Sequence, residues 1–206
     1  LSYSSDLDLV FITDSDYQGE TDGVKPIEVQ QFYLRLAQRI LHLFTTRTMI
    51  GSLYDVDMRL RPSGNAGLLV TRLTTFASYL AEDAWTWELQ ALVRASAIFG
   101  HPDLVNALET LRVDQLCQRR DEETLQQEVI AMRDKMRSHQ ASHEPSSDEH
   151  VKQAKGGMTD LEFLVQYLVL RFAKEYPSLT QYSDNVRILE QCAGNGLFSE
   201  AQAQQL

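Results

Sequence analysis

Two aspartates, Asp6 and Asp8, stand two residues apart in a short apolar segment of the sequence. Residues 6–13 (DLDLVFIT) are rich in apolar and β-branched side chains, which predicts a buried strand. Alternate residues of a strand point to the same face, so both carboxylates would leave the strand side by side. Such a pair repels itself unless a cation lies nearby, and Mg²⁺ prefers hard oxygen ligands together with substrate phosphates. The spacing is therefore compatible with a divalent-cation site, although a solvated pair at a strand edge is the commoner arrangement.

A third carboxylate can come from residues 53–61 (LYDVDMRLR), where apolar and charged side chains alternate strictly. This alternation predicts a strand with one buried face and one charged face. If that strand neighbours the first, Asp57 joins Asp6 and Asp8. Three carboxylates suffice for a two-metal site, in which one ion activates a hydroxyl and the other steadies a triphosphate. Asp55 shares the charged face with Asp57, and the spacing alone leaves the choice between them open.

Four further polar residues could contact phosphate. Ser4 and Ser5 directly precede the paired aspartates, where they could hydrogen-bond phosphate or, equally, cap the start of the strand. Arg59 and Arg61 could neutralise phosphate charge with planar, multi-donor contacts. The alternative is that these arginines pair with Asp55 or with other acids. We predict that one of the two arginines contacts phosphate, and the spacing does not distinguish them.

The elements that position these residues follow from periodicity and turn signals. Apolar residues recur at steps of three and four between residues 27 and 49, which predicts an amphipathic helix. Glycine and proline at 62–67 predict a turn. The same kinds of signal predict a strand at 68–71, a helix at 75–90 and a strand at 91–99. Together these elements predict an α+β domain that extends to about residue 102.

Helical periodicity dominates the rest of the sequence, which predicts an all-α domain over residues 103–206. The predicted helices lie at about 103–116, 121–138, 159–175 and 184–193, and a last one begins near Ser199. Residues 140–155 contain no large apolar residue except Val151, which predicts an exposed loop. We expect the helical domain to continue beyond Leu206.

The composition narrows the class of protein. Of the 206 residues, 43% are hydrophobic and 23% are charged, which is typical of a globular protein. The net charge of −10 and the scarcity of clustered cations argue against nucleic acid as the main partner. No run of about 18 uncharged apolar residues is present, so no membrane-spanning helix is expected. Cys117 and Cys192 form neither a disulfide framework nor a metal motif, and we expect a cytoplasmic protein.

Four ordered motifs resemble a known family. The sequence S-S-D-L-D-L-V-F at residues 4–11 resembles the metal motif of the nucleotidyltransferases in the DNA polymerase β superfamily. The resemblance narrows with V-D-M-R-L-R-P-S-G-N-A-G at 56–67, A-W-T-W-E-L-Q-A-L-V-R-A at 84–95 and G-G-M-T-D-L-E-F at 156–163. This ordered set is similar, over essentially the whole chain, to the bacterial glutamine synthetase adenylyltransferase family, whose members are bifunctional adenylyltransferase and adenylyl-removing enzymes.

The resemblance implies a fold and a set of ligands. It implies a polymerase β-like nucleotidyltransferase domain with a mixed sheet and flanking helices at 1–102, followed by the all-α domain at 103–206. It also implies that Asp6, Asp8 and Asp57 are catalytic metal ligands for two Mg²⁺ ions and that ATP is a substrate. The family has a Gly-Gly phosphate-binding turn before the first strand, which we expect to lie upstream of this sequence.

The resemblance further implies a function. The family carries two related nucleotidyltransferase domains, and this chain is similar to the C-terminal one, which transfers AMP from ATP to a tyrosine hydroxyl of glutamine synthetase. Regulation by PII signalling proteins and by glutamine is implied as well, which places the protein in nitrogen regulation. One alternative is phosphorolytic removal of AMP from adenylylated glutamine synthetase. The other is a non-catalytic module that docks glutamine synthetase or PII through residues 103–206.

Overall fold

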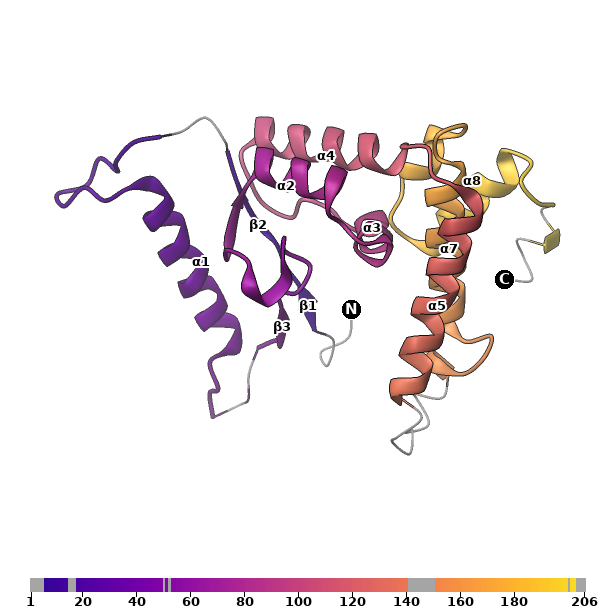
Figure 1. Cartoon of the computed structure of the whole chain (residues 1–206). Helices are drawn as coiled ribbons and strands as arrows, with labels where there is room; N and C mark the ends of the chain where they lie inside the picture. Colours follow the sequence, from indigo (N-terminus) through magenta and orange to yellow (C-terminus); the bar gives the residue numbers. More distant parts are fainter. Residues whose placement is uncertain are drawn as a thin grey trace. The chain divides into compact units, whose positions relative to one another are not determined.

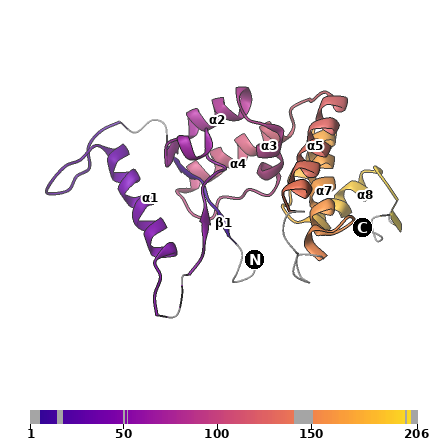
Figure 2. The same ribbon diagram turned by 60° about the horizontal axis from the view of Figure 1, so that its bottom comes forward.

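The computed structural model describes residues 6–14, 18–49, 51, 53–140, 151–199 and 201–202. The chain divides into two compact units, residues 1–84 and 85–206. Figure 1 colours the chain from indigo at the N-terminus to yellow at the C-terminus, and Figure 2 shows it from a second direction. Helices predominate over short strands, so the chain has the predicted α+β composition.

The first unit contains two short parallel strand pairs. Strand β1 (Leu7–Asp8) pairs with β3 (Val56–Asp57), and β2 (Phe11–Thr13) pairs with β4 (Val70–Arg72). The single strand predicted at 6–13 is therefore two strands that pair with different partners. A mixed sheet was expected. Within the described residues, antiparallel pairing is limited to the isolated bridges Glu20–Glu28 and Thr48–Gly51.

Strand β3 is much shorter than the strand predicted at 53–61, because a side chain turns the backbone. The Asp57 carboxylate accepts a hydrogen bond from the backbone N–H of Arg59 at 2.8 Å. Aspartate commonly bonds the backbone two residues onward in this way, and the contact favours a turn over an extended chain. Residues 59–60 are accordingly in a turn, and a 3₁₀ helix, η1 (Gly64–Ala66), follows.

Two helices flank the strands of the first unit. Helix α1 (Val29–Thr45) confirms the helix predicted in this region and contacts β3 and β4. Figure 1 shows it beside the strands of the first unit. Helix α2 (Leu73–Glu82) follows β4 without a loop and contacts both β2 and β4. The buried apolar residues of this unit come from these helices and from the segment after β3: Val29, Ala37, Met58, Phe76 and Leu80.

The helix predicted at 75–90 is broken, and the strand predicted at 91–99 is wrong. Helix α3 (Thr86–Val93) starts anew after α2, where the Glu88 carboxylate accepts a hydrogen bond from the backbone N–H of Trp85 at 2.9 Å. The apolar run that suggested a strand belongs partly to the buried end of this helix, including Leu92 and Val93. Residues 95–98 that follow have no regular structure.

The second unit is helical in its described residues. Its longer helices are α4 (Pro102–Leu116), α5 (Glu122–Gln140), α7 (Met158–Phe172) and α8 (Asn185–Gly194), with a 3₁₀ helix, η2 (Pro177–Thr180), before the last. Helix α7 contacts α3, α5, α8 and η2 and is the centre of the packing. Its buried residues Val165, Val169 and Leu170 meet a core that also includes Leu116, Leu179 and Ile188.

The sequence and the structure place the boundary between the units differently. The predicted division lies at residue 102, whereas the compact units divide after Ala84. Helix α3 accounts for the difference, because it contacts α4, α5 and α7. Most of the loop predicted at 140–155 lies outside the described residues, but residues 151–153 are helical, so the predicted loop is wrong at its C-terminal end. None of the described helices is long and apolar enough to cross a membrane.

Candidate active site

The parallel pairing of β1 with β3 sets two of the predicted carboxylates opposite each other. Asp8 and Asp57 are partners in register. The backbone N–H of Leu9 donates to the Asp57 carbonyl and that of Leu7 to the Asp55 carbonyl, both at 2.9 Å. These two hydrogen bonds fix the register, so the two aspartates, 49 positions apart in the sequence, are neighbours.

Mutual repulsion marks the carboxylates as one cluster. Burial raises the pKa of Asp8, and the negative charges of Asp57 and Asp6 raise this pKa further. Asp6 is exposed and directly precedes β1. Both of the other predicted carboxylates therefore act electrostatically on Asp8. Like charges held together in this way favour a bound cation, because a cation removes the repulsion that the fold imposes.

Between the two candidates on the charged segment, the structure sets Asp57 beside Asp8. Asp55 is exposed, and its backbone carbonyl serves the strand ladder. The carboxylates whose charges raise the pKa of Asp8 are Asp57 and Asp6. The register therefore places Asp57, and not Asp55, opposite Asp8.

Arg59 holds the Asp57 carboxylate. Its Nε donates to Asp57 Oδ2 at 2.6 Å, its Nη2 forms an ion pair with the same oxygen, and its backbone N–H donates to Oδ1. The side-chain hydrogen bond from Arg59 is the main cause that lowers the pKa of Asp57. The arginine side chain is 71% exposed and the aspartate side chain 16% exposed. One of the two predicted phosphate contacts therefore pairs with an acid in this state.

Arg61 serves the neighbouring turn. Its guanidinium donates to the backbone carbonyls of Met58, Asn65 and Gly67, each at 3.3 Å. Gly67 is required by close approach, because a Cβ at this position would lie 1.8 Å from the Pro62 carbonyl oxygen. Arg61 thus stabilises the glycine-rich turn predicted at 62–67 through its hydrogen bonds to the Asn65 and Gly67 carbonyls. Ser4 and Ser5 lie outside the described residues.

The donor chemistry of the cluster fits Mg²⁺. This ion uses one or two protein carboxylates and completes its shell with water and substrate phosphates, and Asp8 and Asp57 supply such a pair. In the described part of the chain, no group of three His, Cys, Asp or Glu side chains is arranged to hold an ion by itself. The guanidinium of Arg59 provides the positive charge at Asp57 in this state.

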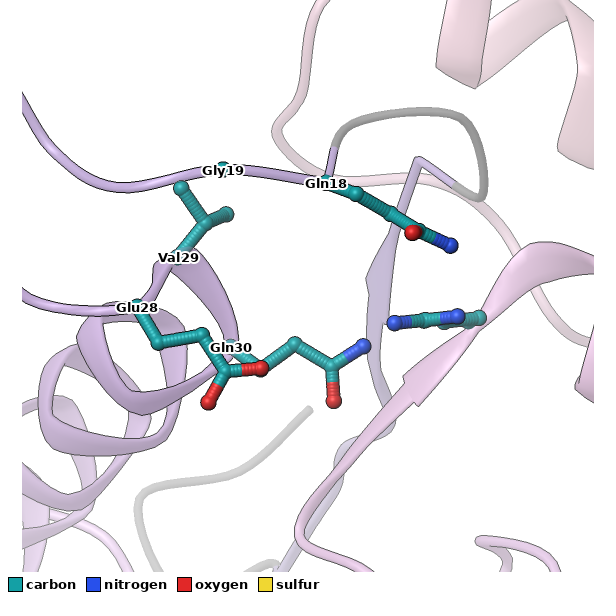
Figure 3. A pocket seen from close by; sticks show the side chains of 6 residues that line it. Gln18, Gly19, Glu28, Val29 and Gln30 are labelled. Atoms are coloured by element: carbon teal, nitrogen blue, oxygen red, sulfur yellow. The ribbon is translucent and has the colours of Figure 1, made fainter.

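A small pocket in the first unit lies apart from these aspartates and was not predicted. It lies beside the start of α1 and is lined by Gln18, Gly19, Glu28, Val29, Gln30 and Arg72. Figure 3 shows the side chains of Gln18, Glu28 and Gln30 around it. With its amide oxygen turned toward Arg72, Gln30 accepts hydrogen bonds from the Arg72 guanidinium. Arg72 is the last residue of β4. No sequence motif identifies this contact, because its partner Gln30 lies on helix α1, far away in the sequence.

The G-G-M-T-D motif of the second unit forms an ion-pair cluster around Asp160. Helix α7 is capped by Gly157, and Thr159 is buried in its first turn. Asp160 accepts from Arg133 Nε at 2.6 Å, from Arg137 Nη2 at 2.5 Å and from the Gly156 N–H at 2.7 Å. Arg133 also donates to the Gln153 carbonyl at 3.0 Å. The motif thus joins α5 to the start of α7.

Comparison with known proteins identifies matches along the whole chain. Residues 1–111 match the family model for glutamate-ammonia ligase adenylyltransferase. Residues 127–206 match the model for GlnD PII-uridylyltransferase. A curated relative from Idiomarina loihiensis, described as a bifunctional glutamine synthetase adenylyltransferase/adenylyl-removing enzyme, is 59% identical over all 206 residues. The chain spans 22% of the length of that relative.

Proposed function

Because the chain belongs to the glutamate-ammonia ligase adenylyltransferase family, we propose that it transfers AMP from ATP to a tyrosine hydroxyl of glutamine synthetase. The observation that carries this proposal is the register pairing of Asp8 with Asp57, with Asp6 close enough to raise the pKa of Asp8. A cluster of carboxylates on adjacent strands is what a metal-dependent nucleotidyltransferase requires. We propose a polymerase β-like fold for the first unit on the same grounds.

Asp6, Asp8 and Asp57 are the residues that would hold two Mg²⁺ ions. When bound, Mg²⁺ would neutralise the negative charge of the triphosphate and lower the pKa of a hydroxyl beside it. Asp57 would also accept the proton of the tyrosine hydroxyl. Ser4 and Ser5 would hydrogen-bond the phosphates, and one of the two arginines would balance their charge. We propose Arg59 for this role, because the Arg61 guanidinium donates to the carbonyls of the turn.

In this reaction the tyrosine oxygen forms a bond to the α-phosphorus as the bond to the pyrophosphate oxygen breaks. The tyrosine proton passes to the carboxylate, and pyrophosphate leaves. Nucleophile and leaving group must lie in line, so the rate comes from positioning and from charge balance. The parallel pairing of β1 and β3 supports this role, since it holds Asp8 and Asp57 on rigid backbone.

The motifs of the first unit favour the C-terminal, adenylylating copy of the family's two nucleotidyltransferase domains. The name of the Idiomarina relative covers both attachment and removal of AMP, and the same carboxylates could serve either direction. We propose glutamine synthetase as the protein substrate, PII and glutamine as regulators, and the cytoplasm as the compartment.

The direction of the reaction is tested with two substrates. The purified protein, extended upstream to include the expected Gly-Gly phosphate-binding turn, is incubated with Mg²⁺, ATP and unmodified glutamine synthetase, and separately with Mg²⁺, phosphate and adenylylated glutamine synthetase. AMP attachment in the first mixture, read by intact mass, supports the proposal. Release of ADP in the second mixture alone would assign the chain to the removing reaction. Absence of both reactions would contradict a nucleotidyltransferase.

A docking function is favoured for the helical unit by one observation. The helical residues 127–206 match a family model that differs from the one matched by residues 1–111. A separate role in binding a protein partner is consistent with that division. Thermal unfolding separates docking from catalysis, because Mg²⁺ and ATP should raise the melting temperature of a nucleotidyltransferase but not of a pure docking module.

A further inference from the structure

The contacts of Arg59 engage both oxygens of the Asp57 carboxylate. Oδ1 accepts from the backbone N–H at 2.8 Å, and Oδ2 accepts from Nε at 2.6 Å and pairs with Nη2. Oδ2 is therefore the oxygen that meets the positive charge. A divalent cation bound to this carboxylate would seek the same oxygen, because a guanidinium and a metal ion both bind carboxylate lone pairs.

The two kinds of contact differ in how easily they can be broken. The backbone hydrogen bond belongs to the turn that ends β3 and holds the carboxylate in place. The guanidinium lies on a long side chain that is 71% exposed, whereas the Asp57 side chain is 16% exposed. Arg59 can therefore swing into solvent while Asp57 stays beside Asp8. An exposed ion pair of this kind is weak enough to exchange.

We propose that Arg59 is a built-in competitor of the divalent cation, neutralising Asp57 until a cation bound to a nucleoside triphosphate displaces it. The inference rests on the proposed function, since it takes Asp8 and Asp57 to be the cation ligands. Displacement leaves the guanidinium free beside the triphosphate, which offers it new oxygens in a geometry suited to a planar fork. Arg59 thereby favours arrival of the cation with the nucleotide over binding of the cation alone.

Arg61 provides the matched control. It lies two residues away and carries the same charge, but its guanidinium donates to the carbonyls of the turn. Replacing either arginine with glutamine removes one positive charge from the same neighbourhood. Only the change at Arg59 frees the Asp57 carboxylate.

The test measures binding of Mn²⁺ without nucleotide, by electron paramagnetic resonance, to the wild-type protein and to the variants Arg59→Gln, Arg61→Gln and Asp8→Asn. We expect Arg59→Gln to bind Mn²⁺ roughly fivefold more tightly than wild type, the factor that removal of an exposed ion pair allows. Arg61→Gln should bind Mn²⁺ as wild type does. Arg59→Lys, which keeps the charge without the two-nitrogen fork, should show a smaller change in the same direction. Circular dichroism establishes that each variant is folded.

The outcomes separate this inference from the proposed function. If Asp8→Asn leaves Mn²⁺ affinity unchanged, the cation site itself is refuted. If Asp8→Asn weakens binding but neither folded variant of Arg59 strengthens it, only the competition is refuted. Equal strengthening by Arg59→Gln and Arg61→Gln would assign the effect to overall charge and would also overturn the proposal.

Discussion

Asp8 and Asp57 face each other in register across the parallel pair of β1 and β3. The ladder bond from the Leu9 N–H to the Asp57 carbonyl holds the two backbones together at this point. The carboxylates are thereby kept close despite their repulsion, which contributes to the raised pKa of Asp8. Perturbed pKa values of this kind cluster at functional sites.

Replacement of either paired aspartate should abolish AMP transfer. Asp8→Asn and Asp57→Asn each remove a charge that would hold the cation, and we expect a loss of at least about a hundredfold in the rate of transfer. Asp55→Asn is the control, because Asp55 lies on the same segment but is exposed. Incorporation of radiolabelled AMP measures the rate. Full activity of either paired variant would contradict the role of these carboxylates.

A methyl group at Gly67 should destabilise the first unit. The added Cβ would overlap the Pro62 carbonyl oxygen, and the backbone of the turn would have to shift. We expect Gly67→Ala to lower the free energy of unfolding by about 2 kcal/mol. Gly23→Ala, where a Cβ meets nothing within 4 Å, should change it by less than about 0.5 kcal/mol. Hydrogen exchange of peptides from the first unit measures both, and equal stability of the two variants would show that the turn yields easily.

The stability of the second unit should depend on Asp160 in acid. Burial acts to raise the pKa of Asp160, but the hydrogen bonds from Gly156 and Arg133 and the charges of Arg133 and Arg137 outweigh it, so the pKa is lowered. The ionised carboxylate is therefore favoured in the folded state. Its contribution is complete above the unfolded pKa of about 3.9 and is lost as the pH falls below that value through the lowered folded pKa.

Asp160→Asn should remove this contribution. We expect a loss of about 3 kcal/mol at pH 7, because Arg133, whose side chain is 6% exposed, is left without its acid. Asp134→Asn, which removes the exposed partner of Arg137, should cost less than about 1 kcal/mol. Urea unfolding followed by tryptophan fluorescence reports on this unit, since both tryptophans belong to it. A variant at Asp160 with the wild-type dependence on acid would refute the assignment.

The two cysteines should differ in reactivity. Burial raises the pKa of the Cys192 thiol to about 11, so only about one molecule in a thousand carries the thiolate at pH 8. Cys117 is partly exposed, although burial also raises its pKa. We expect iodoacetamide to modify Cys117 slowly in the folded protein and Cys192 only after unfolding. Mass spectrometry of the digested protein measures this, and faster labelling at Cys192 would contradict its burial.

The long helices were predictable because their signals are local. Helices α4, α5, α7 and α8 repeat their apolar residues over several turns, and proline begins α4. Alternation at 53–61 placed Asp55 and Asp57 on one face, but it carried no information about which strand would pair with it. The register of β1 with β3 is decided by tertiary packing, which a local sequence pattern does not encode.

The errors arose where one side chain changed the path of the backbone. Asp57 bonds the Arg59 N–H and ends a strand whose alternation continues in the sequence. Glu88 accepts a hydrogen bond from the Trp85 N–H at the start of α3. The N-cap position is occupied by Trp85, which is not one of the residues that usually cap helices, so the start of α3 was missed. The ion pair of Asp160 could not be predicted from the sequence, since its partner Arg133 is 27 residues away. Such contacts are decided by packing and not by local pattern.

The ion pairs around Asp160 also bear on how this chain can evolve. Arg133 and Arg137 anchor α5 to the start of α7, and Arg133 grips the Gln153 carbonyl as well. These ion pairs hold α5 and α7 together independently of the segment that connects them. The entropic cost of closing a longer connection grows only with the logarithm of its length, about 0.6 kcal/mol per doubling. Insertions and deletions between these helices should therefore be tolerated among homologues without disturbing the core.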